Sequence, residues 1–287
     1  EKIQKLIDDC IKQFNAQAPE NSVTLLVAIY KQIQAIDETN DNLRYWKNQK
    51  LKETETLLLA CSGLWIEAST ADYIGIHGQD IGITTQIVCR NKAAAKLNSI
   101  SYLQSDTTTA LNLNTNELYT FRRKEKLSNS LAYSNPYWLN QKHDIGLYSV
   151  TNRDLIGKPE NESSTKIIFN LSILDLNLKV ERTLVYKFTD PVKGEIYRPF
   201  EILPPATLNI PEKVFVFTDA SAKTISVTVK ANASNINGKL ELKGSAGWNI
   251  SVKNPEFKLA NKGDEAIIEA TIIADKSAKD GQLQTSV

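Results

Sequence analysis

The sequence lacks methionine, has only two histidines and three cysteines among its 287 residues, and contains no long apolar run. Without about 20 consecutive apolar residues, no membrane-spanning helix is predicted. The 34 basic side chains balance 33 acidic ones, so the net charge of +1 gives no overall attraction to nucleic acid or to an anionic membrane. The chain starts at Glu1 without a signal-peptide pattern and stops at Val287 within a strand-like stretch, which indicates a piece of a longer protein.

The few histidines and cysteines form no metal-site pattern. His77 and His143 lack HExxH, HxH and paired-cysteine spacings, so no metal or other cofactor is predicted in this chain. His143 precedes Asp144, and an independent enzyme that uses His143 with converging carboxylates stays open as one hypothesis. We expect the cysteines to be small buried hydrophobes, with one long-range disulfide as the alternative. They lie far apart, at Cys10, Cys61 and Cys89.

Residues 1–70 predict a helical connector domain. Apolar side chains recur at helical spacing in three stretches, and the last stretch extends from about Leu43 to Ala68. Helices of this kind can form a small antiparallel bundle, with Trp46 and Trp65 expected in its core. The alternative is that one helix face docks on a domain upstream.

Residues 71–205 predict an antiparallel β-sandwich. Apolar and polar side chains alternate from Ile81 to Cys89, which is the pattern of a strand with two different faces. Arg122–Lys126 is a short charge run and is predicted to be a solvated turn. It contains one acidic residue among four basic ones, which is not a nucleic-acid signature. Further strand candidates lie at 97–103, 111–121 and 166–180.

The stretch 184–205 predicts the hairpin that completes this sandwich. Strand-like runs flank Asp190 and Pro191, which suit the first positions of a type I turn. Gly194 can adopt the left-handed conformation that closes such a loop with a bulge. Pro204-Pro205 then predicts a semi-rigid joint to the next domain.

Residues 206–287 predict a truncated accessory sandwich of the immunoglobulin type. Short alternating strands are separated by turns that contain Gly and Asn, and Trp248 is the expected core anchor. The predicted fold class is therefore α+β multidomain. An N-terminal helical bundle segment is followed by two immunoglobulin-like antiparallel β-sandwich domains.

Aromatic residues near Pro136 form the candidate ligand site. Tyr137 and Trp138 could stack on the C–H face of a pyranose ring, and Asp190 or Arg198 could hydrogen-bond its hydroxyls. The alternative is that the two rings pin a loop onto the sandwich core. Carboxylates beside a turn, such as that of Asp190, also serve as turn caps.

Five sequence segments carry a resemblance to a known family. They read KLKETETLLLACSGLWIEAS, GQDIGITTQIVCRN, NPYWL, LIGKPEN and YKFTDPVKGEIYRPFEILP. In this order they resemble the region downstream of the catalytic domain in large secreted bacterial PIG-L (LmbE-like) deacetylases. The resemblance implies a periplasmic or extracellular parent that uses zinc to remove N-acetyl groups from N-acetylglucosamine-type sugars. It also implies two partners, the upstream catalytic domain of the same chain and N-acetylated glycans.

The catalytic motif of that family is missing from this chain. Its catalytic domain carries His-Pro-Asp-Asp and a distant histidine, whereas neither His77 nor His143 is followed by Pro-Asp-Asp. No catalytic or metal residue is therefore assigned here, and zinc is expected in the missing catalytic domain. We expect a non-catalytic accessory region that supports or orients that domain. A carbohydrate-binding module that uses exposed aromatic residues is the alternative.

Overall fold

The computed structural model describes residues 1–142 and 146–287. The chain forms two compact units, and each is assembled from separate parts of the sequence. The first unit comprises Glu1–Tyr73, Asp80–Leu127 and Val150–Phe200. The second comprises Ile74–Gln79, Ser128–Ser149 and Glu201–Val287.

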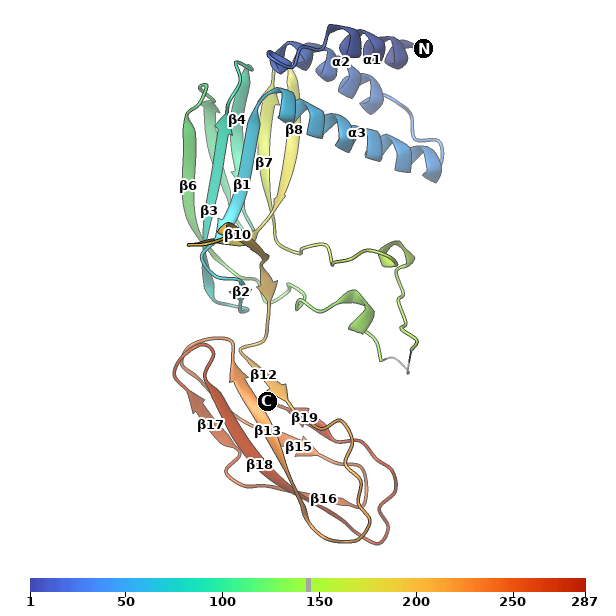
Figure 1. The fold of residues 1–287 in the computed structure, drawn as a ribbon, viewed down its shortest axis with the longest axis vertical. Helices are drawn as coiled ribbons and strands as arrows, with labels where there is room; N and C mark the ends of the chain where they lie inside the picture. The colour runs from blue at the N-terminus through green and yellow to red at the C-terminus, as the bar shows by residue number, and fades with distance from the viewer. Residues whose placement is uncertain (143–145) are drawn as a thin grey trace. The chain divides into compact units, whose positions relative to one another are not determined.

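The described residues of the first unit begin with three α-helices (Figure 1). These are α1 (Lys2–Gln13), α2 (Val23–Gln34), which follows the 3-10 helix η1 (Pro19–Ser22), and α3 (Asp41–Cys61). α2 carries most of the burial, through Val23, Leu26, Val27, Ile29 and Ile33. By contrast, α1 buries none of its residues, and α3 buries Thr54, Leu58 and Leu59 in its last turns. None of the described helices is long and apolar enough to cross a bilayer.

The third helix ends earlier than its apolar pattern predicts. α3 stops at Cys61, and strand β1 (Leu64–Thr70) follows almost at once. Gly63 lies between them with φ +65°, the left-handed conformation that commonly terminates helices. A Cβ atom at Gly63 would lie 2.7 Å from the backbone nitrogen of Asn91. The local geometry therefore requires glycine, and the chain turns from helix to strand at this residue.

This turn changes the environment of both predicted core tryptophans. Trp65 is on β1, and its side chain lies on the outward face, 36% exposed, while Leu64 and Ile66 on either side of it are buried. Trp46 is on α3 and is 51% exposed. The prediction that Trp46 and Trp65 lie in a helical core was therefore wrong.

Two sheets form the described body of the first unit (Figure 1). The larger has the strand order β10-β9-β1-β3-β6 and the smaller the order β5-β4-β7-β8. All neighbouring strands are antiparallel except β1 and β9, which pair in parallel at Ser69–Val185 and Thr70–Tyr186. The strands are β3 (Asp80–Cys89), β4 (Ala95–Ser101), β5 (Asp106–Asn112), β6 (Leu118–Lys126), β7 (Lys166–Ile173), β8 (Leu176–Thr183), β9 (Val185–Asp190) and β10 (Gly194–Pro199). A few helices with many antiparallel strands confirm the α+β class at this level.

The buried faces of the two sheets meet through apolar side chains. Phe169 and Leu171 of β7 and Ile83 and Ile87 of β3 are almost completely buried. The hydroxyls of Thr85 and Tyr102 lie 2.9 Å apart and join β3 to the segment after β4. Alternate residues of each strand face this core, as expected for sheets with one solvent-exposed face.

The predicted hairpin is confirmed. β9 and β10 pair from Asp190–Gly194 to Val185–Pro199. The Asp190 carboxylate accepts hydrogen bonds from the backbone amides of Val192 and Lys193, both at 2.8 Å, and Gly194 has φ +80°. The interpretation of Arg122–Lys126 as a turn was wrong, because these residues continue β6 and pair with β3.

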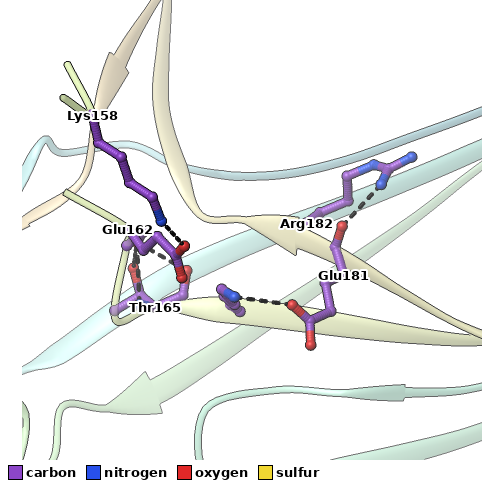
Figure 2. Close-up of polar contacts among 7 residues, drawn as sticks. Lys158, Glu162, Thr165, Glu181 and Arg182 are labelled. Atoms are coloured by element: carbon purple, nitrogen blue, oxygen red, sulfur yellow. Dashed lines mark hydrogen bonds and ion pairs between the residues drawn. The ribbon is translucent and has the colours of Figure 1, made fainter. Parts of the chain in front are cut away.

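Ion pairs surround the start of β7 and the end of β8 (Figure 2). Lys166 lies 3.0 Å from Glu181, and Lys158 lies 2.9 Å from Glu162. Solvent-exposed pairs of this kind contribute about 0–1 kcal/mol each, so they indicate local order rather than a site. Arg182 is more buried, and its Nε donates to the carbonyl of Ile66 at 3.1 Å, which links β8 to β1.

The described part of the second unit is built from strands and short helical turns. Its largest sheet has the order β12-β13-β18-β16, and shorter pairs are formed by β14 with β17, β15 with β19 and, in parallel, β2 with β11. Its elements are β2 (Ile74–Gly75), η2 (Tyr137–Leu139), β11 (Glu201–Ile202), β12 (Ala206–Asn209), β13 (Lys223–Ala231), β14 (Ile236–Lys239), β15 (Glu241–Lys243), β16 (Trp248–Val252), β17 (Glu256–Leu259), β18 (Glu265–Ala274) and β19 (Gln284–Ser286). Trp248 packs against the core of this unit, with its ring centroid 4.8 Å from that of Phe217 and its indole N–H donating to the backbone carbonyl of Lys279.

Candidate functional site

The predicted stacking pair, Tyr137 and Trp138, lies in the helical turn η2 of the second unit. Both side chains are half-buried. Their ring centroids are 4.9 Å apart and the ring planes are nearly perpendicular, at 88°. This edge-to-face contact stabilises the pair but gives the two rings no common plane for a sugar. Sugar binding by Tyr137 and Trp138 stays a prediction.

The two predicted polar partners, Asp190 and Arg198, lie in the first unit at opposite ends of the β9–β10 hairpin. Asp190 caps the turn, and its backbone hydrogen bonds lower the pKa of its carboxyl group. Arg198 pairs across the hairpin with Tyr186, and its guanidinium lies 4.1 Å from the ring centroid of Tyr73. The structure therefore uses Asp190 for the turn and Arg198 for a cation–π contact.

Four polar side chains meet on the outward face of the larger sheet, and we call them the Glu67 cluster: Glu67, Lys187, Glu195 and Tyr197. The ammonium of Lys187 lies 3.0 Å from Glu67 and 3.1 Å from Glu195. The hydroxyl of Tyr197 lies 2.9 Å from Glu67 and 3.0 Å from Glu195, so its single proton can be donated to either carboxylate. Lys187 also lies 5.7 Å from the ring centroid of Trp65 and 5.6 Å from that of Tyr197.

The Glu67 cluster connects β1 to the β9–β10 hairpin, where the backbone pairing between β1 and β9 is short. β9 and β1 are paired at only two positions in the register given above. Glu67 on β1 is 7% exposed although it faces outward, because Lys187 and Tyr197 cover it. A buried carboxylate needs such partners, since an unpaired buried charge is strongly destabilising. The cluster therefore holds the β9–β10 hairpin on the sheet.

The protonation states of the cluster suit a structural role. Burial lowers the pKa of Lys187, but its hydrogen bonds to Glu67 and Glu195 outweigh burial and raise the pKa overall. Burial and then hydrogen bonds to the same carboxylates raise the pKa of Tyr197. Lys187 is thus an ammonium and Tyr197 a neutral phenol at neutral pH. Neither group is available there as a general base or a nucleophile.

High pH should therefore destabilise the first unit through this cluster. Lys187 and Tyr197 both favour the folded state in their protonated forms, so their contribution is complete below about pH 10 and is lost as the pH rises further. We expect the urea midpoint to fall between about pH 10 and about pH 12 more steeply in the wild-type protein than in a Lys187→Met, Tyr197→Phe variant. Equal slopes would argue against the assigned protonation states.

A second notable feature is a set of large apolar side chains on or next to the helices that are at least 51% exposed. They are Ile11 of α1, Phe14 directly after α1, and Tyr45, Trp46 and Leu57 of α3, and we call them the uncovered helix residues. Ile11 is 71% exposed. The first half of α3 extends beyond the turns that α3 buries, and there the rings of Tyr45 and Trp46 pack edge to face at 5.4 Å (Figure 1). Exposed aromatic side chains that pack together, as Tyr45 and Trp46 do, are typical of interaction surfaces.

The structure does not test the hypothesis of an enzyme that uses His143. His143 and Asp144 lie outside the residues that the structure describes. Among the described residues, no three His, Cys, Asp or Glu side chains lie together in a way that could hold a metal ion. The three cysteines are free thiols, and Cys89 is buried while Cys10 and Cys61 are half-buried.

Comparison with known proteins identifies no family. No protein-family model matches this chain, and no curated protein matches it. One solved structure that matches is alkylpurine DNA glycosylase AlkC of Pseudomonas fluorescens, bound to DNA that contains an abasic site analogue, at 11% identity and TM-score 0.21. The match covers 60% of this chain and 48% of the glycosylase. A protein of unknown function from Porphyromonas gingivalis W83 matches at 5% identity and TM-score 0.20, over 74% of this chain and 83% of that one. Likeness at this level supports no conclusion about function.

Proposed function

We propose that this chain is a non-catalytic accessory region of a zinc-dependent PIG-L (LmbE-like) sugar N-deacetylase, which supports or orients a catalytic domain upstream in the same polypeptide. The five resembling segments support the family. In this proposal the N-terminal helices form a bundle, the β units are immunoglobulin-like sandwiches, and the protein works in the periplasm or outside the cell.

The observation that carries the supporting role is the set of uncovered helix residues. α1 has no buried residue, and the first half of α3 exposes Tyr45 and Trp46. Full burial of one large apolar side chain is worth about 1.5–3 kcal/mol relative to leaving it in water. A neighbouring domain that covered these residues would therefore gain several such contributions. The described strands also expose single apolar side chains, such as Ile267 and Leu118, but each large sheet buries one apolar face, whereas α1 buries none of its residues.

Zinc belongs to the upstream domain in this proposal. Amide hydrolysis by zinc needs ligands that hold the ion and a base that activates its water. The described residues do not fit that ion, because they form no group of three candidate ligands. No hydrolytic step is therefore assigned to residues of this chain.

Binding between separately produced parts of the parent protein tests this role. We expect the purified chain to bind its upstream catalytic domain, and a Tyr45→Ala, Trp46→Ala variant to bind about tenfold more weakly or worse, because large aromatic side chains dominate interface energies. Alanine favours helix, so the variant should keep the helical circular dichroism of α3. Ile267→Ala is the matched control, since Ile267 is also an exposed apolar residue but lies on β18. Absence of binding, or equal loss in both variants, would contradict the proposal.

A further inference from the structure

The charged residues of β6 alternate between the two faces of the sheet, and its acidic residue lies on the inner face. Successive side chains of a strand point to opposite sides of the sheet. Glu125 faces the interior, where it is 4% exposed and accepts hydrogen bonds from the backbone of Gln104 and the hydroxyl of Ser105. Arg123 faces the same way and lies 3.5 Å from Glu125. The one acidic residue of the run is therefore on the inner side, and it is paired there.

Three basic side chains remain on the outward face of β6, and we call them the basic row: Arg122, Lys124 and Lys126. A hydrogen bond between Gln86 and Thr120 at 3.2 Å fixes the outward side of β3 and β6. All three basic residues are exposed, and none forms an ion pair with any residue that the structure describes. Because they occupy every second position of a strand, their Cα atoms are about 6.6 Å apart. The basic row thus places three positive charges along one face of β6, with the exposed carboxylate of Asp80 opposite its Lys126 end.

The neighbouring strand leaves space beside the basic row. Thr84, Gly82 and Asp80 of β3 lie opposite Arg122, Lys124 and Lys126 in the register. Gly82 has an ordinary strand conformation, and a Cβ built on it would meet no atom within 4 Å. Glycine inside a strand weakens it and often marks a place where another chain approaches closely. The bare surface at Gly82 is therefore next to the middle charge of the row.

We propose that the outward face of β6 and β3 binds a linear anionic polysaccharide. Its carboxylate or sulfate groups contact Arg122, Lys124 and Lys126, and its sugar backbone lies over Gly82. Regularly spaced cations suit a polymer whose negative groups also repeat. The hydroxyls of Thr84 and Thr120 can exchange hydrogen bonds with the hydroxyls of the sugars. This activity is separate from the supporting role proposed for the helices.

A polysaccharide fits this face better than a nucleic acid does. Proteins that bind single strands combine basic residues with aromatic rings on which the bases stack. Beside the basic row, the outward positions of β3 are Asp80, Gly82 and Thr84, none of them aromatic. Lysine on an edge strand also discourages pairing with other sheets, which would account for charge on β6 but not for the bare surface at Gly82.

Titration of the full chain with oligogalacturonate and with dextran sulfate tests the proposal, with neutral dextran and a single-stranded DNA oligomer alongside. We expect both polyanionic sugars to bind, more weakly as salt is added, and neutral dextran not to bind. Lys124→Gln should lower affinity about two- to fivefold. Lys179→Gln is the matched control, because Lys179 is an exposed strand lysine on β8 of the other sheet, and it should bind as the wild-type protein does.

The variant Gly82→Val distinguishes a specific binding site from non-specific attraction to the charges of an edge strand. It leaves all charges unchanged and replaces a weak strand former by a strong one, so the fold should be at least as stable. We expect it to reduce affinity for the polyanionic sugars about tenfold or more by filling the bare surface. Unchanged binding in Gly82→Val would overturn the proposal. So would no binding of either polyanion at low salt, equal losses in Lys124→Gln and Lys179→Gln, or tighter binding of the DNA oligomer than of the sugars.

Discussion

Replacing Glu67 by alanine should lower the free energy of unfolding of the first unit by about 3 kcal/mol. The change removes the buried carboxylate that holds both Lys187 and Tyr197, at 3.0 and 2.9 Å. Lys187 would keep Glu195 as a partner, but that carboxylate is far more exposed and compensates only in part. Because the cluster supplements the short β1–β9 pairing, the β9–β10 hairpin should loosen first.

A series of substitutions separates charge from hydrogen bonding in this cluster. Glu67→Gln keeps an acceptor for Tyr197 and should cost less than Glu67→Ala. Glu195→Gln, at the exposed end of the cluster, should cost no more than about 1 kcal/mol. Urea denaturation followed by tryptophan fluorescence, to which Trp65 beside Lys187 contributes, measures all three. If Glu195→Gln cost as much as Glu67→Ala, the claim that the buried carboxylate dominates would be wrong.

Gly63→Val should have an effect of similar or larger size, about 3–5 kcal/mol. Gly63 has φ +65°, which is unfavourable for a β-branched residue, and the new Cβ would lie 2.7 Å from the backbone nitrogen of Asn91. Asn91 cannot move freely, because its side chain donates to the carbonyl of Cys61 at 2.9 Å. The helix-to-strand turn after α3 would therefore have to deform.

Gly157→Val is the control for that substitution. Gly157 has φ +88°, and a Cβ at this position would meet no atom within 4 Å. It should therefore show the backbone strain alone, about 1–2 kcal/mol. Thermal or urea denaturation compares the two variants. Equal destabilisation would show that the contact with Asn91 contributes nothing.

Local sequence signals predicted the hairpin correctly. Asp190 and Gly194 act within their own turn, by capping backbone amides and by adopting a left-handed conformation, so their neighbours in sequence are sufficient to reveal them. The switch from helix to strand at Gly63 was missed because the apolar run Leu57–Leu59 and Leu64–Trp65 fits a helix as well as a strand. Glycine directly after Ser62 was the signal that could have placed the end of α3.

The Glu67 cluster and the basic row could not be found from sequence alone. Lys187 and Tyr197 are 120 and 130 positions from Glu67, and only the parallel pairing of β1 with β9 brings them together. In the run from Arg122 to Lys126, the sequence shows one acidic residue among four basic ones. Only strand pairing reveals that Glu125 faces inward, so that the outward positions of β6 from Arg122 to Lys126 are all basic.

Hydrogen exchange tests the supporting role of the helices most directly. The amides in the first half of α3, around Tyr45 and Trp46, would be compared between the parent polypeptide and this chain alone. If the upstream domain covers these residues, their exchange should be slower in the parent by about tenfold or more, while amides of β13 should exchange alike in both. Equal exchange of α3 in the two proteins would contradict the account, because the uncovered helix residues would then have no partner in the same polypeptide.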